Sequence, residues 1–303
     1  MKKSVLLALI LISAVIACRK ADESGRAANM TPAPRTVVAP EKILGVGAGL
    51  KEPRGIGVDA NGQIFVGDSG NQRIVRLDPT GKVLGSWGSW AAESVIADVA
   101  VTADNQVATL NVNPGDVQVF KPDGTPVLRL PGVATNSSGI STGPDGRIWV
   151  ADTGQSRVLR FTSDGKPDGV FTGATDSAHP PFDQPIDVAV APDGTVYVVD
   201  LRSRIMRLAA DGRISAQWAV EHGRARGGSH LAFWRGLIVM TDPDRGRLTV
   251  LDPATGGVRF VGETGTLPGQ FAIPVGISAG RDDKLYVVDS GNARVQVFDD
   301  LRK

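Results

Sequence analysis

Short apolar segments separated by polar turns recur along most of the chain. Residues 53–87 have the sequence PRGIGVDANGQIFVGDSGNQRIVRLDPTGKVLGSW, and residues 274–298 repeat its first part without a gap. Each copy alternates runs of β-branched and apolar residues with turns built from Gly, Asp and Asn, which is typical of β-strands joined by hairpins. The pattern therefore predicts strands along nearly the whole chain and argues against helices.

This pattern occurs six times. Its central aspartate position recurs every 41 to 48 residues, a spacing typical of a four-stranded propeller blade. The six positions are Asp68, Asn111, Asp152, Asp200, Asp242 and Asp289. The sequence predicts an all-β chain that forms one six-bladed β-propeller, with four antiparallel strands in each blade.

The sixth copy stops after its third strand, because the residues after Phe298 are too few to add another. The missing strand is expected at the other end of the domain. Residues 42–47 (KILGVG) are similar to the fourth-strand segment at residues 82–87 (KVLGSW) and precede the first complete copy. We expect this N-terminal strand to complete the last blade and close the ring, which removes open sheet edges.

The first residues have the composition of an export signal. Two lysines precede an apolar run over residues 5–16, which suits a signal-peptide core and is too short to span a membrane. The sequence ending in Ala17 and Cys18 resembles the lipobox of bacterial lipoproteins; an ordinary cleavage site is the alternative. The resemblance implies export and a lipid anchor on Cys18 in the cell envelope. Arg19, rather than Asp, at the next position favours the outer membrane if the organism is Gram-negative.

The chain is predicted to have three parts. Residues 1–17 form the signal peptide, residues 18–40 have the Ala-, Pro- and Ser-rich composition of a flexible tether, and residues 41–303 form the propeller. Cys18 is the only cysteine, so an intramolecular disulfide and a cysteine-based metal site are excluded. The formal charge is +1, and it becomes −1 without the two signal lysines. A nearly neutral domain lacks the positive field of a nucleic-acid binder.

The repeat unit P-x-G-I-x-V-D-x-x-G-x-I-x-V-x-D-x-x-N-x-R-I resembles the NHL repeat. The resemblance covers nearly all of residues 42–298; residues 53–74 and 274–295 match closely, whereas the second, third and fifth copies are degenerate. It implies the propeller fold. It leaves the function open, because the same scaffold hosts binding modules and enzymes.

Five of the six copies place an arginine shortly after the central aspartate. Repetition around the ring argues that these residues build the blades, with the carboxylate capping turn amides and pairing with the arginine. Departures from the repeat are therefore better functional candidates. The predicted structural pairs are Asp68 with Arg73, Asp152 with Arg157, Asp200 with Arg204, Asp242 with Arg247, and Asp289 with Arg294.

Three residues that depart from the repeat lie where the first strands of their copies begin. Aligned by spacing, His230 falls at the position of Ile56, which is aliphatic in the other copies; a packed core histidine is the alternative. One position earlier, Asp98 and Asp187 replace small residues and should lie near the upper mouth of the central channel. The two carboxylates could hold a hard divalent cation there; a solvated pair beside a water-filled channel is the alternative.

The longest insertions between strands lie at residues 172–184 and 219–229. We expect both on the face formed by the loops before the first strands, where long loops on a rigid scaffold carry function. From Arg202 to Arg247 the chain uses arginine often and no lysine, which favours an anionic partner; a solvated arginine-rich face is the alternative. The loop candidates are His179, His222, Arg224 and Arg226, together with Trp90 in the loop after the first copy.

Two groups of enzymes with similar architecture deserve comparison. Resemblance to the peptidyl-hydroxyglycine amidating lyases, which contain NHL-like repeats, implies zinc held by three histidines from separate blades. This chain has only His179, His222 and His230, and the last two are close neighbours in sequence. A catalytic zinc normally takes three protein ligands, so this match is poor.

Gluconolactonase-type propellers are similar in blade number, and that resemblance implies a divalent cation held by carboxylate and amide ligands. Glu52, Asp98, Asp187 and Asn136 could supply such a set, but no local motif beyond Glu52-Pro53 matches. Nucleophilic catalysis has no support, because the all-β pattern offers no strand-to-helix elbow for a G-x-S-x-G serine.

These observations favour a binding platform over an enzyme, with catalysis left open. We expect an exported, lipid-anchored, monomeric propeller that binds an envelope protein, peptide or glycan. The lipid would be its only contact with the membrane, and nucleic acid is not an expected partner. No cofactor is expected beyond the divalent cation considered at the channel mouth. A metal-dependent lactonase-like or lyase-like propeller is the alternative function.

Overall fold

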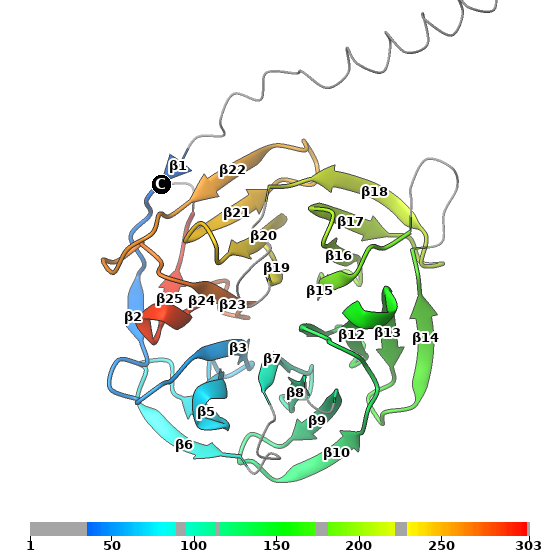
Figure 1. Cartoon of the computed structure of the whole chain (residues 1–303). Helices are drawn as coiled ribbons and strands as arrows, with labels where there is room; N and C mark the ends of the chain where they lie inside the picture. The colour runs from blue at the N-terminus through cyan, green and yellow to red at the C-terminus, as the bar shows by residue number, and fades with distance from the viewer. Residues whose placement is uncertain (1–34, 89–94, 113–114, 174–180, 222–228, 302–303) are drawn as a thin grey trace, which may run out of the picture. The chain divides into compact units, whose positions relative to one another are not determined.

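The computed structural model of the chain describes residues 35–88, 95–112, 115–173, 181–221 and 229–301. These residues form a six-bladed β-propeller, with the blades following one another around a central axis (Figure 1). The helical residues described there are three single 3₁₀ turns, at Ser69–Asn71, Thr153–Gln155 and Ser290–Asn292. Among the described residues, no helix is long and apolar enough to cross a membrane. The predicted all-β propeller is confirmed.

Within each blade, strands consecutive in sequence pair side by side and antiparallel. The first three blades contain β3 (Pro53–Val58), β4 (Ile64–Asp68), β5 (Arg73–Leu77) and β6 (Val83–Trp87); β7 (Ile96–Val101), β8 (Val107–Asn111), β9 (Asp116–Phe120) and β10 (Pro126–Leu130); and β11 (Gly139–Thr142), β12 (Ile148–Asp152), β13 (Arg157–Phe161) and β14 (Pro167–Phe171). The first strand of each blade lies nearest the axis (Figure 1).

The last three blades repeat this order. They contain β15 (Pro185–Val190), β16 (Val196–Asp200), β17 (Arg204–Leu208) and β18 (Ile214–Ala219); β19 (Leu231–Trp234), β20 (Leu237–Asp242), β21 (Arg247–Leu251) and β22 (Val258–Val261); and β23 (Pro274–Ala279), β24 (Leu285–Asp289) and β25 (Arg294–Phe298). The sixth blade thus takes only three strands from the C-terminal part of the chain.

The fourth strand of the sixth blade comes from the N-terminal side. The strand β2 (Lys42–Leu44) pairs antiparallel with β25, with Leu44 opposite Val295. Leu44 is buried in the core between the sixth and first blades. The predicted closure of the ring is confirmed.

The propeller begins earlier than residue 41. Arg35 and Thr36 form β1, which pairs in parallel with β22 as a fifth strand of the fifth blade, and Val38 is buried. The end predicted for the tether at residue 40 is therefore wrong, because Val38 just before it packs into the core of the fifth and sixth blades. Cys18 and the signal segment lie outside the described residues.

The central aspartates secure the hairpins between second and third strands. All five predicted Asp–Arg pairs are ion pairs, with N–O distances between 2.5 and 3.1 Å and fully buried carboxylates. In the first blade Asp68 also accepts the backbone N–H of Lys51, so the pair ties the hairpin to the loop that precedes the blade. In the second blade Asn111 takes the aspartate position, and Asp116 beside it pairs with Arg129 instead.

Two tryptophans at the ends of fourth strands pack between blades. Trp87 lies against Phe65 of its own blade and Phe120 of the next. Trp218 packs against Tyr197 of its own blade and against the core cluster that includes Leu251 of the next blade. The hydrophobic core is therefore divided among the blade interfaces around the ring, which leaves the axis lined by the first strands.

Candidate functional site

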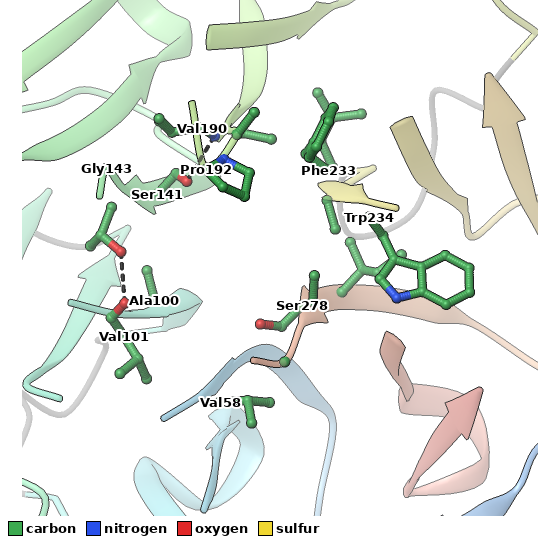
Figure 2. A pocket seen from close by; sticks show the side chains of 18 of the residues that line it. Val58, Ala100, Val101, Ser141, Gly143, Val190, Pro192, Phe233, Trp234 and Ser278 are labelled. Carbon is green, nitrogen blue, oxygen red and sulfur yellow. Dashed lines mark hydrogen bonds between the residues drawn. The ribbon is translucent and has the colours of Figure 1, made fainter. Parts of the chain in front are cut away.

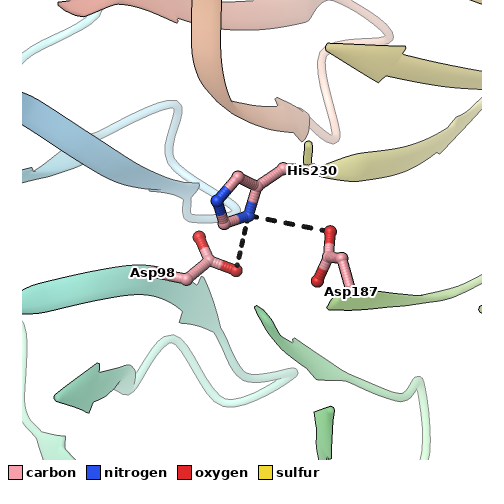
Figure 3. Close-up of side chains that lie close together, drawn as sticks. All are labelled: Asp98, Asp187 and His230. Carbon is pink, nitrogen blue, oxygen red and sulfur yellow. Dashed lines mark ion pairs between the residues drawn. The ribbon is translucent and has the colours of Figure 1, made fainter. Parts of the chain in front are cut away.

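Asp98, Asp187 and His230 meet near the axis of the propeller, with their side chains directed toward one another (Figure 3). They come from β7, from β15 and from the residue just before β19. His230 Nδ1 lies 3.4 Å from Asp98 Oδ2 and 3.7 Å from Asp187 Oδ2. All three residues are at most 6% exposed. From the sequence, Asp98 and Asp187 were expected as a pair and His230 as a separate candidate; the fold brings all three into one cluster, named here the axial triad.

Strand pairing shows that the predicted repeat position of His230 is wrong by one residue. Ile56 lies opposite Val66 in the first blade, and Leu231 lies opposite Met240 in the fifth. Val66 and Met240 are each two residues before the central aspartate. Leu231 therefore occupies the aliphatic position, and His230 occupies the position one residue earlier.

The cause of this shift is a shorter hairpin in the fifth blade. Arg235 and Gly236 alone connect β19 to β20, and both have positive φ angles, of 51° and 80°. Two such residues form the type I′ turn that closes tight hairpins. The other blades have five residues between these strands, as at residues 59–63. The absence of a Pro-Asp-Gly or Asn-Gly turn in this copy was the signal that could have revealed the shift.

The corrected alignment reveals a layer of six residues around the axis. Three blades contribute a polar side chain and three contribute glycine. In ring order the residues are Gly55, Asp98, Gly139, Asp187, His230 and Gly276.

The glycines let neighbouring first strands approach closely at this layer. A Cβ at Gly55 would overlap the backbone of Asp98, and a Cβ at Gly139 would overlap the Asp187 carboxylate. A Cβ at Gly276 would likewise overlap backbone of the first blade. A ring of six side chains would not fit this narrow part of the axis, so the triad depends on the glycines between its members.

Backbone N–H groups of following blades hold the two carboxylates. Asp98 Oδ2 accepts the N–H of Ile140 at 3.1 Å, and Asp187 Oδ2 accepts the N–H of Leu231 at 2.6 Å. His230 Nδ1 and Asp187 Oδ1 are buried and have no hydrogen-bond partner. The triad is thus firmly positioned and retains unused donor and acceptor capacity.

Burial and mutual charge shift the proton affinities of the triad. Burial favours the neutral form of Asp187 and raises its pKa to about 8. The charge of His230 lowers this pKa, and the charge of Asp98 raises it further. Burial alone would lower the pKa of His230, but the carboxylate of Asp98 outweighs it and, with Asp187, raises that pKa to about 9. The cluster therefore favours the imidazolium form of His230 and the neutral form of Asp187.

A cavity of about 580 Å³ lies on the turn side of the triad, and Asp98 lies in its wall. Side chains from first strands surround it, as Figure 2 shows for Val101, Val190 and Phe233. The aliphatic layer next to the triad lines it with Ile56, Val99, Ile140, Val188, Leu231 and Ile277. From the sequence, ligand binding was expected on the opposite, loop-rich face, so this cavity was not foreseen.

The rim of the cavity carries three charged residues. Arg235 stacks on Trp234 and pairs with Asp283 at 2.9 Å. Arg281 is exposed and donates one hydrogen bond to the carbonyl of Ala103. Since no ion pair to Arg281 occurs among the described residues, it gives the rim a local positive charge.

The remaining predicted site residues do not join the triad. Glu52 and Asn136 are exposed residues in left-handed backbone conformations. The cluster of possible metal ligands in the described part of the chain contains neither of them. The loop candidates Trp90, His179, His222, Arg224 and Arg226 lie outside the described residues.

Comparison with known proteins supports the repeat and the fold. A family model of the NHL repeat matches residues 50–77 and 271–298. Over 121 residues the chain is 29% identical to the peptidylglycine alpha-amidating monooxygenase of Rattus norvegicus, a match that covers 37% of this chain and 12% of the rat protein. The mouse protein matches over the same length at 30% identity. The chain thus matches only a small part of these relatives.

Solved structures match over most of the propeller. A streptogramin B lyase structure aligns with a TM-score of 0.61 at 14% identity, covering 84% of this chain and 96% of the other. The virginiamycin B lyase of Staphylococcus aureus aligns with a TM-score of 0.56 at 16% identity, covering 83% and 85% of the two chains. At this identity the likeness establishes the fold alone. The chain is a six-bladed β-propeller that contains NHL repeats.

Proposed function

We propose that this protein is an envelope-anchored binding module whose axial cavity takes an extended peptide segment. The observation that carries the proposal is the cavity itself, enclosed by the first strands of all six blades. Its volume of about 580 Å³ falls within the range of ligand pockets. Asp98 of the axial triad lies in its wall, so a ligand that enters from the turn side would approach that carboxylate.

The cavity wall combines two kinds of surface that suit a peptide. Each first strand is the terminal strand of its sheet, so its inner edge carries backbone groups without a neighbouring strand. Such edges pair with extended chains, while pockets between them receive side chains. Valine, isoleucine, phenylalanine and tryptophan side chains supply apolar contacts here.

Charge at the rim favours a peptide with a free carboxyl end. Arg281 is exposed at the rim, and its guanidinium presents several donors in a planar arrangement suited to a carboxylate. A chain end inserted with its apolar side chains in the cavity would place its carboxylate within reach of this residue. The proposed envelope location rests on the lipobox-like segment that ends at Cys18.

The test uses the anionic apolar dye 1-anilinonaphthalene-8-sulfonate as a probe of the cavity. Ser278 is half-buried and points toward the open centre (Figure 2). We expect saturable binding of one dye per chain by fluorescence titration, and loss of that binding in Ser278→Trp, which fills the cavity. Ser86→Trp on the exposed outer strand β6 is the matched control and should bind like the wild type.

Synthetic apolar tetrapeptides then test the ligand class. Peptides with a free C-terminal carboxylate should compete with the dye at least tenfold better than their amidated forms, and Arg281→Gln should abolish that difference. Equal competition by both forms would overturn the role of Arg281. Dye binding that is unsaturable, or that survives in Ser278→Trp, would overturn the cavity as the binding site.

A metal-dependent lactonase-like or lyase-like enzyme is the second candidate. The meeting of two carboxylates and an imidazole within 4.8 Å favours it, because such groups can hold a catalytic metal or transfer protons. The triad is nearly fully buried, which argues against direct access by substrate. Turnover of aryl esters or lactones that disappears in Asp187→Asn would favour the enzyme, and its absence with divalent metal added would favour the binding module.

A further inference from the structure

We propose that the axial triad is a binding site for one divalent transition-metal ion of the zinc type, which joins the second, fourth and fifth blades across the axis. This site lies beyond the proposed peptide site and does not depend on it. Its ligands would be Asp98 Oδ2, Asp187 Oδ2 and His230 Nδ1.

The spacing of the three atoms suits a small ion. Two ligands of a tetrahedral zinc ion, each about 2.1 Å from the metal, lie about 3.4 Å from each other. In this structure Nδ1 lies 3.4 and 3.7 Å from the two carboxylate oxygens. All three ligand atoms lie within 4.8 Å of one another. The two carboxylates therefore need only a small inward movement to share an ion with the imidazole.

An unused buried atom points to a ligand at this place. His230 Nδ1 faces both carboxylates at ion-pair distances of 3.4 and 3.7 Å, yet neither contact has the geometry of a hydrogen bond, and the side chain is 3% exposed. Buried polar atoms nearly always have a partner, so each exception calls for an explanation. A metal ion between the three side chains would give Nδ1 a partner and balance the negative charge of both carboxylates.

The surroundings supply the support that metal ligands usually have. Ile140 N–H and Leu231 N–H each bond the carboxylate oxygen that would face the ion, which fixes the orientation of both carboxylates. Thr241 Oγ1 accepts the His230 N–H and donates to the carbonyl of Val275, which fixes the backbone that carries the imidazole. The site is thus preorganised by contacts between blades.

The donor set selects the class of ion. Calcium and magnesium prefer oxygen ligands, whereas an imidazole with two carboxylates suits zinc and its first-row neighbours. The pair Asp98 and Asp187 alone had suggested a hard cation, and the addition of His230 changes that expectation. Three protein ligands leave a zinc ion one further position for water.

The full-length protein, treated with chelator and then dialysed, provides the test. Isothermal titration with Zn²⁺ should show one high-affinity site per chain, and elemental analysis should recover one zinc after a second dialysis. Co²⁺ should bind at the same site and give the intense visible absorption of tetrahedral coordination. Bound Zn²⁺ should also raise the melting temperature of the propeller.

Variants locate the ion. Asp98→Asn and His230→Gln should each lower the affinity for Zn²⁺ at least a hundredfold. The double variant His179→Ala with His222→Ala removes the other two histidines of the chain and should bind like the wild type, as should Asp193→Asn at an exposed turn. Circular dichroism establishes that each variant is folded.

Three results would overturn the proposal. These are a wild-type protein that takes up no Zn²⁺, zinc that persists unchanged in folded Asp98→Asn, and zinc lost in the double histidine variant. If Asp98→Asn fails to fold, the Co²⁺ spectrum of the wild-type protein tests the metal site instead. A spectrum of octahedral coordination would overturn the proposal. Dye binding in the cavity is measured separately, so failure of the metal site leaves the peptide proposal standing.

Discussion

Gly139 lies directly against Asp187, and a Cβ at residue 139 would overlap the Asp187 carboxylate. The two residues occupy equivalent positions in neighbouring blades, so a glycine in one blade makes room for the functional side chain of the next. The same relationship holds between Gly55 and the backbone of Asp98. The axial triad is therefore a property of the whole layer, including its three glycines.

The variant Gly139→Ala tests this relationship. We expect a loss of about 1–3 kcal/mol in the free energy of unfolding, because an added methyl group overpacks the axis. Gly85→Ala is the matched control, since Gly85 lies on an outer strand with no atom near its Cβ position. Urea unfolding of both variants provides the comparison, and equal stability would contradict the close contact at the axis.

The structural pair in the sixth blade gives a second prediction. Arg294 is nearly buried; it pairs with the fully buried Asp289 at 3.0 Å and bonds three backbone carbonyls. Arg294→Met should cost about 3–5 kcal/mol of unfolding free energy, because it leaves a buried carboxylate without its cation. Arg213→Met removes the exposed partner of Asp211 and should cost at most about 1 kcal/mol. Similar losses in both variants would contradict a blade-building role for the repeated pair.

Closure of the ring gives a third prediction. Leu44 and Leu84 hold the same place in the two similar KxLG segments, yet Leu44 is 4% exposed and Leu84 is 43% exposed. Leu44→Ala should lower the free energy of unfolding by about 2–5 kcal/mol, because it leaves a cavity where the ring closes. Leu84→Ala should change it by less than about 1 kcal/mol. Thermal unfolding followed by circular dichroism measures both, and a reversed order would contradict closure by β2.

The proposed anchor gives a fourth prediction. Cys18→Ser removes the thiol that a lipid would modify, so the protein should move from the membrane fraction to the soluble fraction of the cells that produce it. Labelling with a radioactive fatty acid should mark the wild type and not the variant. A variant that stays in the membrane fraction would show that another feature holds the protein there.

The fold could be predicted from the sequence because its signals are local and repeated. A few neighbouring residues are enough to indicate a strand, and Gly, Asp or Asn indicates a turn. Six copies of this pattern at a regular spacing therefore predict six blades. The similarity of residues 42–47 to residues 82–87 even indicated the strand that closes the ring. The position of His230 was missed by one residue, because the two-residue turn at Arg235 and Gly236 shortens one hairpin without changing the pattern around it.

Local sequence patterns were enough to predict the propeller, its blade-building Asp–Arg pairs and the three residues that depart from the repeat. Only the folded ring shows that Asp98, Asp187 and His230 share one layer and lie within contact distance. It also shows that the cavity lies on the turn side of that layer. The physical reason is that contacts across the axis join blades far apart in the chain. Their geometry depends on the closed ring and on the exact register of every first strand, which no local pattern encodes.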